Sequence, residues 1–200
     1  MKPIIIEKLS RLFTAFPGIG QRQASRFAYW LADADKTFVV NLKSVLDELA
    51  SVKKCRLCFR IHSGKDFCSI CSDSGRDGAK IAVIEKDTDL EAMEKSGVYD
   101  GRYHVLGGLL SSLDSESRDK IRLKEIFNRV KKERGVNEII LALSATPEGE
   151  FSSRYIEKIL EPLKSERKIK ITRLGRGLST GAEVEYLNKE TLKNALENRK

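Results

Sequence analysis

The four cysteines of this chain stand at positions 55, 58, 68 and 71, as two C-x-x-C pairs with nine residues between them. Each pair places two thiolates on one tight turn, and nine residues allow the two turns to close tetrahedrally around a single ion. Cys55, Cys58, Cys68 and Cys71 are therefore the predicted ligands of one Zn²⁺ per chain. Because four thiolates leave no coordination position for water, this metal would stabilise structure and would not hydrolyse a substrate.

Two disulfides, or one redox-active cysteine pair, are the alternatives to a metal. The chain opens Met1-Lys2-Pro3 with no secretory signal, and no apolar run has the length of a membrane span. We therefore expect a cytoplasmic protein, without membrane attachment, whose thiols stay reduced. A redox site would need only one C-x-x-C pair, beside a βαβ unit. The paired spacing favours structural zinc.

Basic residues outnumber acidic ones, and the excess is concentrated near the N-terminus. The 200 residues include 37 Lys and Arg against 29 Asp and Glu, which gives a formal net charge of +8. Residues 1–78 hold 13 basic and 8 acidic side chains, so this part carries five of the eight surplus charges. A basic N-terminal part predicts a polyanionic partner, most commonly nucleic acid.

The spacing of apolar residues changes along the chain from a purely helical pattern to an alternation of strands and helices. Helices are expected at residues 6–16, around residues 24–31 and from about residue 41. After a polar linker at residues 72–78, strands are expected at 80–85, 103–106, 138–143 and 168–174, with helices at 87–96, 123–134 and 154–164 between them. This alternation predicts an α/β domain with a mostly parallel sheet, in a multidomain α/β chain.

A phosphate-binding hairpin is predicted between the first two helices, at the sequence PGIG. Gly18 and Gly20 allow a tight turn whose backbone N–H groups point outward at the start of a helix. Arg22 and Arg26, four residues apart, would add charge on one face of that helix. An ordinary connection between two helices is the alternative, but the local basic excess favours DNA binding that does not read sequence.

Three glutamates are expected to meet at the carboxyl ends of the strands. Glu85 ends the first predicted strand of the α/β domain, and Glu148 and Glu150 follow the third. Ligands bind at this edge of open α/β sheets, and a lone Glu with an acidic pair could hold Mg²⁺ for phosphoryl transfer. The same charges could instead dock a basic partner protein. Asp87 and Asp89 are expected to cap the helix that follows.

The last 26 residues begin with a glycine-rich stretch, GRGLSTGAEVEY. This stretch lacks the lysine of a phosphate-binding P-loop, so we expect a loop that runs into a short strand at residues 184–187. The chain is thus predicted to have four parts: a helix-hairpin-helix region (1–53), a zinc finger with its linker (54–78), an α/β domain (79–174) and a glycine-rich C-terminal segment (175–200). His62 and His104 are interpreted as structural residues and not as catalytic bases.

Taken in order, these motifs resemble the bacterial RecR family of recombination mediators over essentially the whole chain. The most specific pieces are CRLC with CSIC, GRYHVL, TPEGE and GAEVEY. The resemblance implies that the α/β domain is a Toprim domain, as in topoisomerases and primases. It also implies a non-enzymatic, DNA-binding protein in recombinational DNA repair, which forms dimers or tetrameric rings and works with RecO and RecF to load RecA on gapped, SSB-coated DNA.

The chain departs from the family pattern at three places. Gln21-Arg22 stands where members usually carry Pro-Lys, Gly181-Ala182 replaces a Gly-Gly pair, and Asn188 replaces an Asp. Arg22 keeps the cation beside the hairpin, whereas the two changes in the tail alter a loop to which we assign no role.

Two classes of function remain, a DNA-binding assembly protein and a Mg²⁺-dependent Toprim nuclease or strand-transfer enzyme. Glu-x-Glu is longer than the Asp-x-Asp of catalytic Toprim sites, and no obvious nucleophilic tyrosine accompanies it. We therefore favour the assembly protein, and we interpret the three glutamates as a docking surface. The family resemblance implies a bacterial, nucleoid-associated location in the cytoplasm.

Overall fold

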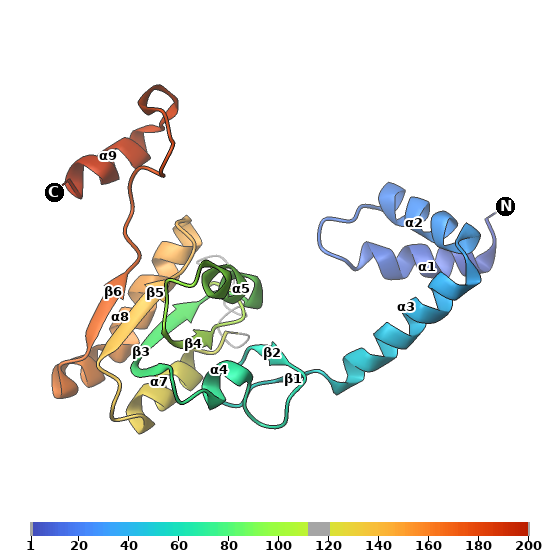
Figure 1. The fold of residues 1–200 in the computed structure, drawn as a ribbon. Helices are drawn as coiled ribbons and strands as arrows, with labels where there is room; N and C mark the ends of the chain where they lie inside the picture. Colours follow the sequence, from blue (N-terminus) through green and yellow to red (C-terminus); the bar gives the residue numbers. More distant parts are fainter. Residues whose placement is uncertain (1, 112–120, 200) are drawn as a thin grey trace. The chain divides into compact units, whose positions relative to one another are not determined.

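The computed structural model describes residues 2–111 and 121–199. The chain divides into two compact units, Met1–Val52 and Lys53–Lys200, which we call the N-terminal unit and the larger unit (Figure 1). None of the helices in these described ranges combines the length and the apolar character needed to cross a bilayer.

The N-terminal unit consists of helices α1 (Ile4–Thr14), α2 (Gln21–Asp33) and α3 (Lys36–Glu48), followed by a single 3-10 turn, η1 (Leu49–Ser51). Helix α3 begins earlier than the predicted residue 41. The Asp35 carboxylate accepts a hydrogen bond from the Thr37 N–H at 2.7 Å, which caps the helix at that point. The expected helix-hairpin-helix arrangement of α1 and α2 is confirmed.

The larger unit begins with a small ribbon that carries the cysteines. Strand β1 (Lys53–Lys54) pairs antiparallel with β2 (Ile61–His62), and the short helix α4 (Ser69–Ser72) follows. We call residues 53–72 the cysteine knuckle.

A four-stranded sheet forms the centre of the larger unit, in the order β4-β3-β5-β6 with every pair parallel. Its strands are β3 (Asp77–Ile84), β4 (Gly101–Val105), β5 (Glu138–Ala142) and β6 (Lys170–Arg173), and its helices are α5 (Asp87–Ser96), α7 (Leu123–Lys132) and α8 (Pro147–Arg167). The predicted α/β fold with a parallel sheet is confirmed. Helix α5 has its predicted bounds, and Gly97 closes it in the left-handed conformation at φ 67°.

Side chains of β3 alternate between two cores, one on each face of the sheet. Ile81 and Val83 lie in a cluster with the buried residues of α7 and α8. Ala82 and Ile84 face the other way, into a cluster that contains Leu90 of α5 and three of the cysteines. The cysteine knuckle therefore shares a core with the sheet.

Three expectations about local structure are wrong. The predicted strand at residues 184–187 is a 3-10 turn, η2 (Val184–Tyr186), and a helix that was not predicted, α9 (Lys189–Glu197), follows it. Helix α8 begins at Pro147 and not at residue 154, because Thr146 caps it there. The predicted linker is shorter, since β3 already begins at Asp77.

Candidate metal centre and nucleic-acid interface

The four cysteine sulfurs converge on one point. Cys55, Cys58 and Cys68 are buried, Cys71 is half-buried, and their Sγ atoms all lie within 4.8 Å of one another. The Sγ atoms of Cys58 and Cys68 are 3.5 Å apart, far beyond a disulfide bond. Tetrahedral coordination with a metal–sulfur distance of about 2.3 Å would place the sulfurs about 3.8 Å apart. The donor set thus fits a closed metal site.

Tight backbone turns place these sulfurs. After the first pair, Phe59 adopts a left-handed conformation at φ 65°, and its N–H donates to the Cys55 carbonyl at 3.0 Å. The Cys68 N–H points at the Cys55 sulfur, 3.4 Å away, which brings the second pair beside the first. The hydrogen bond between Cys58 and Cys68 raises the pKa of Cys58 and lowers that of Cys68. A bound cation would allow all four to ionise.

The cysteine knuckle is fastened to β4 by a backbone hydrogen bond and to α5 by a bond to a side chain. The Val105 N–H in β4 donates to the Cys58 carbonyl at 2.8 Å. The Ile61 N–H in β2 donates to the Asp87 carboxylate at 2.8 Å. Asp87 was predicted to cap α5, but it holds β2 instead, while Asp89 accepts from the Lys86 N–H and does cap the helix.

Phe59 of the knuckle packs against a buried histidine of the sheet. Its ring meets the His104 ring edge-on at a centroid distance of 5.3 Å, and the Arg122 guanidinium lies over the Phe59 ring, 5.4 Å from its centroid. Burial lowers the pKa of His104 to about 3, so the imidazole is neutral. The structural interpretation of His104 therefore agrees with its surroundings.

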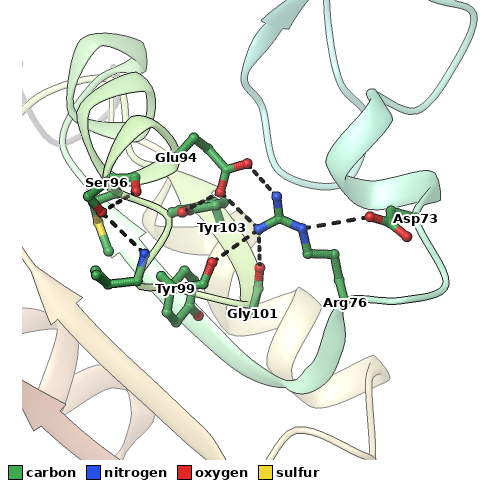
Figure 2. A network of polar contacts seen from close by, with 9 residues as sticks. Asp73, Arg76, Glu94, Ser96, Tyr99, Gly101 and Tyr103 are labelled. Carbon is green, nitrogen blue, oxygen red and sulfur yellow. Dashed lines mark hydrogen bonds and ion pairs between the residues drawn. The ribbon is translucent and has the colours of Figure 1, made fainter.

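A partly buried ion pair joins Arg76, in the segment between the cysteine knuckle and β3, to α5 and β4 (Figure 2). Arg76 forms a two-pronged pair with Glu94, and its Nε lies 3.9 Å from an Asp73 oxygen. The Tyr103 hydroxyl donates to the same Glu94 carboxylate at 2.7 Å. Burial alone would raise the pKa of Glu94, but hydrogen bonds from Arg76 and Tyr103 outweigh it and hold that pKa below its ordinary value.

The predicted hairpin exists between α1 and α2. The Ile19 N–H donates to the Phe16 carbonyl at 3.1 Å, and Gly18 between them has φ 77°, which is the geometry of a type II turn. A Cβ atom on Gly18 or Gly20 would meet no atom within 4 Å, so the backbone there is open to a ligand.

The start of α2 carries no negative charge of its own. Gly20 is the N-cap and offers no side chain, and the first turn contains no acidic residue. Arg22 and Arg26 are exposed on the same helix. Free N–H groups, the positive end of the helix dipole and two arginines together suit an anionic ligand.

The acidic edge, which we define as Glu85, Glu148 and Glu150, lies where β3 and β5 end side by side. The parallel register pairs Ile84 with Ala142, so the residues after both strands emerge at one edge of the sheet. The Ser144 hydroxyl, in the connection after β5, donates to Glu85 at 2.9 Å. This edge is also the point where the strand order reverses, since β4 lies on one side of β3 and β5 on the other.

The sequence TPEGE forms the start of α8. The Thr146 hydroxyl accepts from the Gly149 N–H at 3.2 Å, and Pro147 occupies the first turn. Gly149 is required, because a Cβ there would lie 1.8 Å from the Ser144 carbonyl oxygen. Glu148, the residue before Gly149, is exposed in the first turn of the helix.

Glu150 differs from the other two glutamates because arginines neutralise it. It forms ion pairs with Arg173 of β6, at 2.9 Å, and with Arg176. Glu85 has a looser ion pair with Lys86, at 3.8 Å, so the net negative charge of the acidic edge rests mainly on the exposed Glu148. Among residues 2–111 and 121–199, the cysteines are the one group of three or more His, Cys, Asp or Glu whose ligand atoms converge.

Comparison with known proteins places these features in one family. Residues 79–175 match the Toprim domain family, and residues 177–200 match the family described as RecR, C-terminal. The chain is 39% identical over 198 residues to the Recombination protein RecR of Lactobacillus acidophilus, which covers 98% of this chain and 97% of that protein. It is 40% identical over 198 residues to the Recombination protein RecR of Chlorobaculum tepidum, covering 97% and 95% of the two chains.

The chain belongs to the RecR family. The resemblance inferred from its motifs is confirmed, and so is the Toprim nature of the α/β domain. In this RecR-family chain, the matched Toprim residues 79–175 contain the parallel sheet except for the first two residues of β3, and the match at residues 177–200 contains α9.

Sequence reasoning missed the charged residues that join elements across this RecR-family chain. Arg76 and Glu94 are 18 residues apart, and Arg173 lies 23 residues from Glu150. No spacing rule connects such pairs. The start of α8 did carry a signal, because Thr followed by Pro is a common N-cap and first-turn pair.

Proposed function

We propose that this RecR-family chain is a DNA-binding recombination mediator in recombinational DNA repair. It works with RecO and RecF to load RecA onto gapped DNA coated with SSB, in the bacterial cytoplasm at the nucleoid. The observation that carries this proposal is the uncapped, acid-free start of α2 with Arg22 and Arg26 exposed beside it. Gly18, Gly20 and the two arginines form the DNA contact, which reads phosphates and not bases.

The metal at the four cysteines is Zn²⁺, one per chain, with a structural role. Thiolate ligands select soft or borderline ions, and four of them in a closed set are typical of structural zinc. Cys58 and Val105 share a backbone hydrogen bond, so the ion stabilises the sheet as well as the knuckle.

The acidic edge docks a basic protein partner, for which RecO is the candidate. Glu148 is exposed in the first turn of α8, and the Ser144 hydroxyl holds Glu85 beside it at the same edge of the sheet. RecO must itself hold DNA and therefore carries basic surface, which makes the charges complementary. A Mg²⁺-dependent Toprim nuclease or strand-transfer enzyme is the second candidate, favoured only by the position of these acids at the strand ends. The pairing of Glu150 with two arginines supports the non-enzymatic function.

Removal of the two hairpin arginines tests the DNA contact. Arg22→Ala with Arg26→Ala should weaken binding to gapped DNA equally for all sequences, and the salt slope of log K should fall by about one to two units. A matched control, Lys95→Ala with Lys158→Ala, removes two exposed cations from α5 and α8 and should leave both quantities nearly unchanged.

The same protein and DNA, incubated with Mg²⁺, separate the two candidate functions. A mediator leaves every strand intact. Strand scission that depends on Mg²⁺ and disappears in Glu148→Lys would establish the nuclease instead. A double arginine variant that binds with the wild-type slope would make the hairpin an ordinary turn.

A further inference from the structure

The cysteine knuckle carries a second strongly basic surface, in addition to that of the hairpin. Residues 53–67 contain five basic side chains and one acidic one. Lys53, Lys54, Arg56 and Lys65 are all exposed in the structure. The single acid, Asp66, lies 3.3 Å from Arg56, so the positive charge of the other residues is not matched within this segment.

The knuckle also exposes an aromatic ring two residues after Lys65 in the chain. The Phe67 residue is 52% exposed, whereas Phe59, the other aromatic side chain of the knuckle, is packed against His104. Phe67 directly precedes Cys68, whose N–H contacts the Cys55 sulfur at 3.4 Å. Since Lys54 and Arg56 flank Cys55 in the chain, the ring and these cations lie on neighbouring turns of one small scaffold.

The loop that presents Phe67 is held at both ends. The Arg56 N–H donates to the Asp66 carbonyl at 3.1 Å, and the Gly64 N–H donates to the His62 ring at 3.0 Å. A Cβ on Gly64 would lie 2.9 Å from that ring, so the loop is closely turned. An exposed phenyl ring on a held loop is not required for the core, which leaves its position to be explained by a ligand.

We propose that the cysteine knuckle is a second nucleic-acid contact, specific for single strands, in which Phe67 stacks on an unpaired base while Lys54 and Lys65 contact phosphates. Aromatic side chains flanked by cations are the common platform for single-stranded DNA, because every base has a stacking face. In a duplex the base faces are already stacked on one another, so only the lysines could contact it, through its phosphates. This contact adds to the hairpin and suits a protein whose proposed substrate contains both duplex and single-stranded regions.

Two substitutions at Phe67 test the stacking contact, with a short oligonucleotide that contains 2-aminopurine as the probe. Phe67→Leu should weaken single-strand binding roughly tenfold and abolish the quenching of the probe, and Phe67→Tyr should retain both. Ile61→Ala, in the same ribbon and 50% exposed, is the matched control and should behave as wild type. Duplex binding should be unaffected by Phe67→Leu. Metal content and the circular dichroism spectrum confirm that each variant is folded.

Lys54→Gln with Lys65→Gln should lower the salt slope for single strands by about 1.4 units, at about 0.7 per phosphate contact. The control pair Lys95→Gln and Lys158→Gln should not change it. Wild-type binding and slope in the knuckle variants, with a loss in the Arg22 and Arg26 variant, would overturn this proposal and leave the hairpin contact intact. Equal losses on duplex and single strands from Phe67→Leu would also overturn it.

Discussion

The N-terminal unit and the larger unit place their apolar side chains in opposite ways. Of the 28 buried apolar residues in the described ranges, three lie in the N-terminal unit and 25 in the larger unit. Of the 23 exposed large apolar residues, 14 lie in the N-terminal unit, although it is about a third as long. The larger unit can therefore be stabilised by its own core, and the N-terminal unit lacks one.

The three helices of the N-terminal unit show why. The buried residues of α1 and α2 are Ile6, Ser10, Ala24 and Ala28, and α3 has none. Phe13, Phe16, Trp30 and Phe38 instead line an apolar groove of about 440 Å³. Exposed apolar surface of this extent marks an interaction site. We expect a second copy of the chain to cover it, in the dimer or ring that the family resemblance implies.

The largest effect should come from removal of the proposed zinc, because the four cysteines share a core with the sheet of the larger unit. Cys58→Ser, or removal of the ion by a chelator, should unfold the knuckle and expose the core that it shares with the sheet. Structural zinc contributes about 10 kcal/mol or more in small zinc domains, so the variant should aggregate or melt far below wild type. Thermal unfolding followed by circular dichroism measures this.

Elemental analysis provides the stoichiometry. Fresh protein should hold one zinc per chain, because a closed four-thiolate site remains occupied through purification. Less than about half a zinc per chain would contradict the assignment. If the sheet melts at the same temperature in Cys58→Ser as in wild type, the knuckle does not stabilise the rest of the larger unit.

The second-largest effect should distinguish partner binding by the larger unit from DNA binding by the N-terminal unit. Glu148→Lys should reduce affinity for a RecO-type partner by roughly thirtyfold or more, since loss of one desolvated charge pair costs about 2–5 kcal/mol. DNA binding by the hairpin should stay intact or become slightly stronger, because the change removes a negative charge. Surface plasmon resonance, first with the RecO-type partner and then with DNA, measures the two affinities. Glu161→Lys, on the same helix, is the control, and equal loss in both variants would refute a specific acidic edge.

The Arg76–Glu94 pair tests how firmly the segment before β3 is joined to α5 (Figure 2). Glu94→Gln weakens a charge-assisted hydrogen-bonded pair and should lower the free energy of unfolding by about 2 kcal/mol at pH 7. The pKa of Glu94 lies below its ordinary value of 4.5, so the carboxylate stabilises the fold above that pH, and this contribution is lost as the pH falls further.

The difference in unfolding free energy between wild type and Glu94→Gln should accordingly shrink below about pH 4.5. Denaturant titrations at pH 7 and at successively lower pH measure it. Glu91→Gln, exposed on the same helix, is the control and should cost under about 0.5 kcal/mol. A pH-independent difference would show that Glu94 acts through packing and not through its charge.

The sequence predicted those parts of the chain that are marked by local signals. Helix α5 was bounded correctly because Asp89 and Gly97 mark its two ends. The cysteine spacing predicted the convergence of four sulfurs, because ligand geometry is fixed by turns of a few residues. Helix α9 was missed, since only Asn188 and a short apolar pattern announce it after a glycine-rich loop.

Contacts between distant residues could not be predicted in this way. The Arg76–Glu94 pair depends on how β3 and α5 come together, and the arginines facing Glu150 come from β6 and the segment beyond it. Each partner alone looks like an ordinary surface charge in the sequence. Such pairs follow from the tertiary fold, whereas the elements themselves follow from local spacing and capping.

The smallest effect on a single chain, and the most direct test of the difference between the units, is a change in the apolar face of α3. Leu46 is 54% exposed, so Leu46→Gln should alter the stability of an isolated chain by less than about 0.5 kcal/mol. If a second copy covers this face, the same change should weaken self-association about tenfold, which corresponds to about 1.4 kcal/mol. Sedimentation over a range of concentrations measures the constant. Leu196→Gln, similarly exposed at 60% but on α9, indicates whether the C-terminal helix also contributes. If the wild-type protein stays monomeric and its N-terminal unit stays folded at all concentrations, the exposed apolar face is not an interface between two copies of the chain.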